Sequence, residues 1–136
     1  MASLLTTPEN SELFHRIRKG PLFPQILLTL DSHSGVKTGW ARCCGFNLNK
    51  NKVFALPLHA SFALESEQEA GNLVLACPEA GLSLHLTGTF VSLSEPSLVT
   101  HFWKKLEPIV EVLRSSPEQL LEFQVESAKK DRFYQD

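Results

Sequence analysis

Residues 82–93 constrain the fold more than any other stretch of the chain. Leucines alternate with polar residues in Leu-Ser-Leu-His-Leu-Thr, and this period of two is typical of a strand with one buried face. Gly88 interrupts the alternation, which indicates a bulge or a close approach by another backbone. Because the apolar run 72–77 and a turn with proline and glycine at 78–81 come directly before it, we expect a long antiparallel hairpin here.

Four further runs predict strands on either side of this hairpin. Consecutive apolar residues at 26–28 predict that the first of these strands is buried on both faces. The last run fits a helix or a strand, and the alternation of Leu121, Phe123 and Val125 with polar residues favours a strand. Residues 128–136 are expected to form a polar tail. The expected strands are 24–30, 36–46, 52–56 and 119–126, with turns at 31–35 and 47–51.

Helix signals occur at three places. Thr7-Pro8-Glu9 combines a capping hydroxyl, a first-turn proline and an acid, and Gly20-Pro21 ends the predicted helix. Residues 64–70 contain strong helix formers and predict a short helix. Ser94-Glu-Pro96 starts a third helix, which Pro108 breaks or redirects. The broad apolar face of that helix comprises Leu98, Val99, Phe102, Trp103 and Leu106.

These elements predict a mainly β fold, a six-stranded antiparallel split β-barrel with flanking helices, because no βα repeat is visible. The 136 residues fit a single domain, with an N-terminal helix and lead-in at 1–23 and the barrel at 24–136. A net charge of −2 argues against a nucleic-acid surface. No apolar run approaches the ~20 residues of a membrane span, and no export signal is visible, so a cytoplasmic protein is expected.

Sequence motifs for chemistry are few. Cys43 and Cys44 face opposite sides of their strand, so we expect buried free thiols in a reducing cytoplasm rather than metal ligands. His59, His85 and His101 are scattered, and no metal site is expected. The sequence has no glycine-rich phosphate loop and no Gly-x-Ser-x-Gly elbow, although a catalytic triad assembled in space stays open.

Several stretches carry a resemblance to a known family. The order of elements resembles the flavin-binding split barrels of the pyridoxamine phosphate oxidase superfamily, and above all its short branch similar to general stress proteins. The stretches that match are Ile26-Leu-Leu-Thr-Leu-Asp31 with Gly35, Trp40-Ala-Arg42, 52–56, 72–77, 82–90, the helix with Phe102-Trp103, and 121–125 with Phe133-Tyr134.

The resemblance implies a homodimer that binds flavin mononucleotide (FMN) at the subunit interface, while relatives bind deazaflavin or haem. It places Arg42 as the phosphate-binding arginine and Ser61 as the serine of a serine-x-lysine segment. The lysine position falls on Ala63, a departure that removes one charge from the phosphate site. Lys50 and Lys52 are possible substitutes only from the turn before the third strand.

Other candidates and alternatives come from the residues themselves. His59 and Ser61 lie where backbone N–H groups can face an anion, and Trp103 can stack on a ring system or simply fill a core. Arg42 can instead form an ion pair with Glu65, Glu67 or Glu69, or simply be exposed, and the missing charge at Ala63 favours this alternative. The 65–69 charge cluster is most simply a solvated helix face. The functions left open are an FMN-binding oxidoreductase-like protein of unknown substrate, a cofactor-free split-barrel dimer with a binding or structural role, and haem binding through one histidine.

Overall fold

The computed structural model describes residues 4–19, 24–32, 34–59, 62–77, 81–113 and 115–132. Within these ranges the chain forms six strands and two α-helices, with short 3₁₀ turns η1, η2 and η4 between them. The elements are η1 Leu4–Thr6, α1 Pro8–Lys19, β1 Gln25–Ser32, β2 Gly35–Asn47, η2 Leu48–Lys50, β3 Lys52–Pro57, β4 Gln68–Cys77, β5 Leu82–Ser92, α2 Pro96–Leu113, η4 Pro117–Gln119 and β6 Leu121–Arg132.

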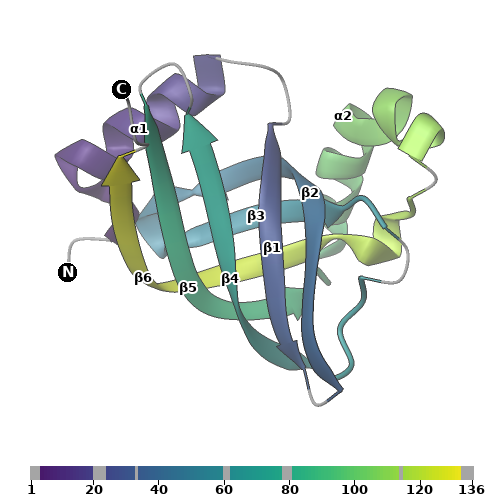
Figure 1. Ribbon diagram of the computed structural model, residues 1–136. Coiled ribbons are helices and arrows are strands. Elements are labelled where there is room, and N and C mark those ends of the chain that lie inside the picture. The colour runs from purple at the N-terminus through teal and green to yellow at the C-terminus, as the bar shows by residue number, and fades with distance from the viewer. Residues whose placement is uncertain are drawn as a thin grey trace.

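The six strands form one closed antiparallel barrel in the order β1-β2-β3-β6-β5-β4, and β1 pairs with β4 to complete the ring (Figure 1). The predicted fold class is therefore confirmed. The predicted hairpin is β4 and β5, which pair from Gln68 with Val91 to Cys77 with Leu82. Among the described residues, neither helix is long and apolar enough to span a bilayer.

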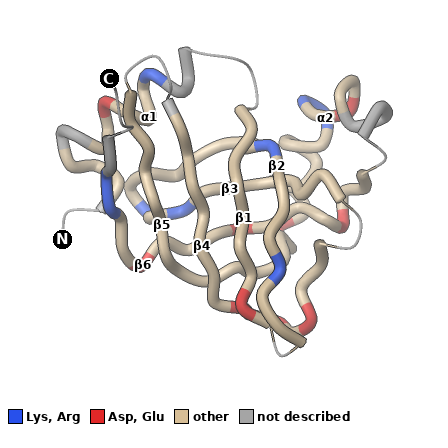
Figure 2. The backbone as a smooth tube through the Cα atoms, viewed as in Figure 1, with Lys and Arg blue, Asp and Glu red and all other residues tan. Residues whose placement is uncertain are grey.

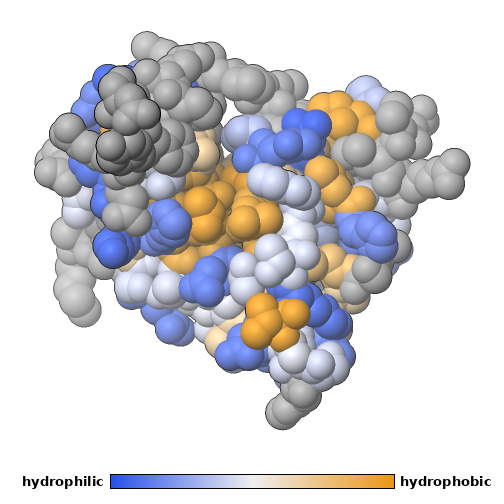
Figure 3. Space-filling model, in the orientation of Figure 1, coloured by the Kyte–Doolittle hydropathy of each residue, from blue (hydrophilic) through white to orange (hydrophobic). Residues whose placement is uncertain are grey.

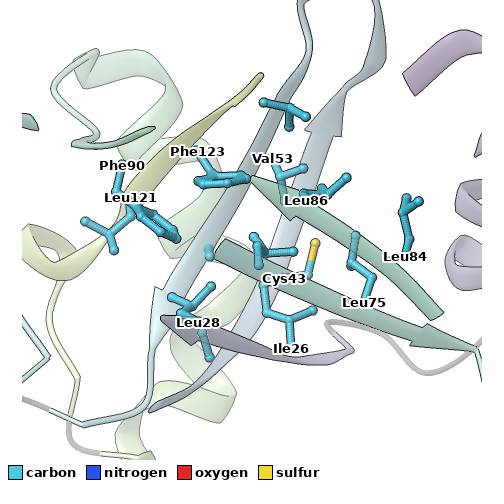
Figure 4. Packing of buried hydrophobic residues seen from close by; sticks show 14 of the residues in the cluster. Ile26, Leu28, Cys43, Val53, Leu75, Leu84, Leu86, Phe90, Leu121 and Phe123 are labelled. Carbon is cyan, nitrogen blue, oxygen red and sulfur yellow. The ribbon is translucent and has the colours of Figure 1, made fainter. Parts of the chain in front are cut away.

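The barrel interior is a continuous apolar core (Figure 4). Inward residues of every strand supply it, and Leu5, Leu13 and Phe14 of the N-terminal segment belong to the same cluster. The rings of Phe14 and Phe46 meet edge to face at 4.5 Å, so α1 covers one end of the barrel. Fully burying one such side chain contributes about 1.5–3 kcal/mol. The labelled interior residues are Ile26, Leu28, Cys43, Val53, Leu75, Leu84, Leu86, Phe90, Leu121 and Phe123.

Burial of β1 differs from the expectation. Ile26, Leu28 and Leu30 are fully buried, but Leu27 is only half-buried, so one face of the strand is inside and the other is open. The prediction of burial on both faces was wrong because antiparallel barrels bury one side of each strand and leave the other side to whatever covers it.

Gly88 lies at a bulge, as its place in the alternation predicted. The β5–β6 register shifts between Thr87, which faces Ser127, and Gly88, which faces Val125. A Cβ atom on Gly88 would collide with the carbonyl oxygen of Gln124, so only glycine fits here. The extra residue in β6 reverses its alternation, and Ala128 instead of the next odd-numbered residue packs against the core.

Two expectations were wrong for related reasons. The predicted polar tail is strand up to Arg132, because residues of β6 beyond the bulge pair with β5 as far as Leu82. The predicted helix at 64–70 is not formed, because β4 begins at Gln68, and Glu69 and Ala70 pair with Phe90 and Thr89. A seven-residue helix is marginal on its own, whereas the strand gives each backbone amide a partner in the ladder.

The second helix covers the outer face of β3. Phe102 and Leu106 of α2 pack with Phe54 and Leu56, which point outward from β3, and with Leu120. The helix continues through Pro108 to Leu113. A second apolar cluster therefore lies outside the barrel wall, separate from the interior core.

Candidate functional site

The candidate phosphate ligand Arg42 lies on the outer face of the barrel. Its neighbours Ala41 and Cys43 are buried in the interior, so the alternation of β2 directs Arg42 outward, where it is half-buried. Across the sheet Arg42 stands opposite Gln25 of β1 and Leu56 of β3. The arginine therefore sits beside the end of β3, where the chain leaves the sheet.

The segment after β3 is held between β2 and the loop after α2. The Leu58 N–H donates to the Trp40 carbonyl at 3.0 Å. The His59 carbonyl accepts from the Phe62 N–H at 3.0 Å and from the Gln119 side-chain amide at 3.4 Å. These bonds fix the backbone while leaving the His59 side chain exposed.

Ser61, the candidate serine, lies outside the described residues. Ala63, at the position of the expected lysine, is exposed. Lys52 does not compensate, because its ammonium pairs with Glu122 at 3.4 Å and it stands four residues, or about 13 Å, along β3 from Leu56. Lys50 lies further away still, in η2. Neither lysine substitutes for the missing charge.

Trp103 lies half-buried on α2, against the cluster that contains Leu56. Since Leu56 is also the neighbour of Arg42, the two candidate residues flank one part of the outer wall. The packing explains Trp103 as part of the helix cover, and its role toward a ring system stays a prediction. The structure thus groups Arg42, Trp103 and the 57–59 segment on one side of the barrel.

Two of the acids proposed as ion-pair partners for Arg42, Glu65 and Glu69, have partners elsewhere. Glu65 pairs with Lys37 at 3.6 Å and accepts the Ser34 hydroxyl at 2.6 Å. The hydrogen bond from Ser34, aided by the charge of Lys37, lowers the pKa of Glu65. Glu69 is buried rather than part of a solvated helix face, which corrects that interpretation of the cluster.

The remaining candidate residues lie on different parts of the barrel. Cys43 is in the interior core and Cys44 in the outer cluster, both as free thiols, and burial raises the pKa of the Cys44 thiol. The His85 ring is exposed on β5, where it meets the Ser83 hydroxyl at 3.1 Å. Across the described part of the chain, no group of three or more histidines, cysteines or acids is placed to hold a metal ion.

The structure contains a polar pocket that the sequence did not lead us to predict. It has a volume of about 270 Å³ and is lined by Asp31, Ser32, Ser66, Gln68, Glu69 and Ala70. The signal was present: extending the inward positions Leu75 and Leu73 back by twos reaches Gly71 and then Glu69. The inward position of Glu69 was not predicted, because residues 64–70 were expected to form a helix.

Solved structures of known proteins share this architecture. A relative of general stress protein 26 from Clostridium acetobutylicum, described as of the pyridoxinephosphate oxidase family, superimposes with a TM-score of 0.63 over 90% of this chain and 87% of its own, at 11% identity. A pyridoxamine 5'-phosphate oxidase-related, FMN-binding protein from Nostoc punctiforme has a TM-score of 0.57 over 93% and 85%, at 10% identity. HupZ from Group A Streptococcus has a TM-score of 0.57 over 92% and 98%, at 11% identity.

The chain has the split-barrel fold of these proteins. The resemblance expected from the sequence is thereby confirmed at the level of fold, across about nine-tenths of the chain. No family model and no curated protein matches the sequence. In this split barrel, the functional candidates must therefore be judged on the chain's own residues, because fold alone does not determine function.

Proposed function

We propose that this split barrel binds FMN on its outer surface beside Arg42, at an interface between two copies of the chain, and acts as a flavin-dependent oxidoreductase. The observation that carries the proposal is the position of Arg42. It is half-buried on the outside of β2, next to residues 57–59 after β3 and to the α2 cover. A structural neighbour is described as FMN-binding, which supports the same ligand class.

The residues have separate roles under this proposal. The planar guanidinium of Arg42 pairs with two phosphate oxygens, and its half-buried position reduces screening by water. The exposed His59 offers a second polar contact, together with Ser61, and Trp103 contributes an aromatic wall. When bound, the isoalloxazine ring supplies the redox chemistry, while the chain binds it, orients it and limits water access.

The exposed apolar side of the barrel supports the dimer. Trp40, Leu27 and Val74 stand opposite one another across β2, β1 and β4, and the Trp40 side chain is 58% exposed. Figure 3 shows hydrophobic surface gathered over β1 and β4 on this side. A contiguous apolar area of this kind typically marks an interaction site, and we assign it to a second copy of the chain.

A second function is favoured by one observation. Ala63 stands exposed where a phosphate-binding lysine is expected, and Lys52 is occupied by Glu122. A phosphate dianion would then have one cationic side chain, that of Arg42, instead of the arginine and the lysine that the resemblance implies. On this alternative the protein is a cofactor-free split-barrel dimer with a binding or structural role.

The visible spectrum of protein purified without added cofactor separates these functions. A flavin band at about 450 nm supports the first function. Absence of this band, together with absence of binding when FMN is titrated into the protein, supports the second. An intense Soret band would instead indicate haem.

Arg42→Ala tests the site itself. We expect FMN affinity to fall by about 10- to 100-fold, because charge-assisted hydrogen bonds to the phosphate are lost. Lys37→Ala is the matched control, since it removes a cation from the same strand but one that pairs with Glu65. Fluorescence quenching of free FMN gives both dissociation constants, and equal values for Arg42→Ala and the wild type would remove Arg42 from the site.

A further inference from the structure

The polar pocket beside the β1–β2 hairpin lies at the end of the barrel where Ser32 ends β1 and Glu69 lies near the start of β4. Leu30 pairs with Gly71, so two residues further along each strand bring Ser32 and Glu69 to the same level of the wall. Acidic segments gather around this end, with basic segments on the neighbouring β2 (Figure 2). The pocket is separate from Arg42 and from the proposed flavin site.

Glu69 is an unusual residue for this position. Its side chain is only 5% exposed, and it stands opposite Phe90 on the inward side of β4. It accepts the Glu65 backbone N–H at 2.8 Å. An ionised carboxylate has about four acceptor positions, and burying its charge is costly unless a positive partner is present.

Ser32 supplies a second, independent observation. The side chain is 8% exposed and lines the pocket, and its hydroxyl has no hydrogen-bond partner among the described residues. The other lining hydroxyl differs, because Ser66 already donates to the Gln68 carbonyl at 2.7 Å. Leaving a buried hydroxyl without a hydrogen-bond partner is unfavourable, so the position of Ser32 points to a ligand group that completes it.

The charge of the pocket selects the kind of ligand. Its described lining includes two carboxylates, those of Asp31 and Glu69, and none of the described lining residues is a lysine, arginine or histidine. The nearby Lys37 pairs with Glu65, which is itself an acid of the same region. A cationic ligand therefore fits the pocket, and an anionic one does not.

Geometry separates an organic cation from a metal ion. No described group of three or more acids, histidines or cysteines is placed to hold a metal. An ammonium group instead needs three acceptors, and the pocket offers two carboxylates and a hydroxyl. The volume of about 270 Å³ also admits an organic body as well as its charged end.

We propose that this pocket binds the primary ammonium group of a small organic amine, through the Glu69 carboxylate and the Ser32 hydroxyl, with Asp31 adding negative charge at the mouth. The amine donates one hydrogen bond to each of these groups and neutralises the buried carboxylate. No bond is made or broken in this binding.

Titration of the whole chain with 1,5-diaminopentane tests the proposal. Calorimetry and thermal unfolding measure the binding. We expect saturable binding with a dissociation constant below about 10 mM, because hydrogen bonds between an ammonium group and a carboxylate are charge-assisted and stronger than neutral ones. Glu69→Gln keeps the shape of the side chain and should weaken binding by about ten-fold or more, and Ser32→Ala by about three- to ten-fold. Glu67→Gln, an exposed acid outside the lining, should change it less than about two-fold.

Each other outcome overturns the assignment. Absence of saturable binding, or equal affinity for Glu69→Gln and the wild type, removes the pocket as an amine site. Equal binding of tetramethylammonium, which has no N–H donors, shows that charge alone acts. Stronger stabilisation by calcium or magnesium chloride at matched ionic strength assigns the pocket to a metal instead. Circular dichroism of both pocket variants confirms folding, and Ser32→Ala decides the matter if Glu69→Gln does not fold.

Discussion

Two outer faces of the barrel differ in what covers them. On β3, the outward Phe54 and Leu56 are buried under α2. On β4, β1 and β2, the outward Val74 and Leu27 are half-buried and Trp40 is largely exposed, because no described segment lies over them. The same alternation builds both faces, so the outward apolar residues are buried only where another element of the chain packs over them.

Removing the helix cover should have the largest effect. Leu106→Ala deletes a fully buried side chain at the centre of the α2 contact and should lower the free energy of unfolding by about 2–5 kcal/mol. Lys105→Ala, at the exposed neighbouring position, should change it by about 0.5 kcal/mol or less. Urea denaturation measures both, and similar values would mean that α2 does not stabilise the barrel.

Changing the open face should affect association more than folding. Trp40→Ser removes the most exposed member of the apolar row and should weaken self-association by about ten-fold or more, with a change in unfolding free energy of about 1 kcal/mol or less. Sedimentation velocity over a concentration series measures the association. Val36→Ser is the control, since Val36 is also exposed but lies about 13 Å along β2 from Trp40.

This comparison would fail in two ways. A wild-type protein that is monomeric at all concentrations would leave the open face without a second copy. Equal association of the wild type and Trp40→Ser would move the interface to another part of the surface.

The smallest expected effect concerns the hydrogen bond from the Ser34 hydroxyl to the Glu65 carboxylate. The Ser34 hydroxyl holds the pKa of Glu65 below its ordinary value, so the folded pKa lies below the unfolded one. The stabilisation by this group is complete above the unfolded pKa and is lost as the pH falls through the lowered, folded pKa. Ser34→Ala should raise the pKa of Glu65 and reduce this loss.

Carboxyl-detected NMR titration of Glu65 measures that change. Lys37→Ala should shift the Glu65 pKa upward by less, because the Ser34 hydrogen bond is the larger cause. A larger shift in Lys37→Ala would show that charge, rather than the hydroxyl, controls this carboxylate.

The parts of the fold that the sequence predicted correctly are those where burial enforces a period of two. Leu84 and Leu86 are fully buried and Leu82 packs against the core, so a shift by one residue would turn all three away from it. The bulge was predictable at Gly88, but its effect on β6 was not. The extra residue belongs to the partner strand, so the alternation of Val125 and Ala128 changes phase without any local signal.

The site was predictable only in part, for the same physical reason. Arg42 points outward because its strand neighbours point inward, and this follows from local sequence. The meeting of Ser32 and Glu69 depends on pairing between β1 and β4, residues far apart in the chain. Strong helix propensity at 64–70 gave the wrong structure there, because pairing with β5 outweighed it.

Closure of the ring has a consequence for how molecules of this protein can meet. Since β1 pairs with both β2 and β4, each strand in the described barrel has a neighbour on either side. The ladders do not run the full length of every strand, because β2 pairs with β3 only from Ala41 onward and β6 pairs with β3 only as far as Gln124. Within the described barrel, the backbone edges open to an incoming strand are therefore confined to such overhanging ends. Fibre growth by strand addition would start at these ends, or would first require a seam of the ring, such as that between β1 and β4, to separate.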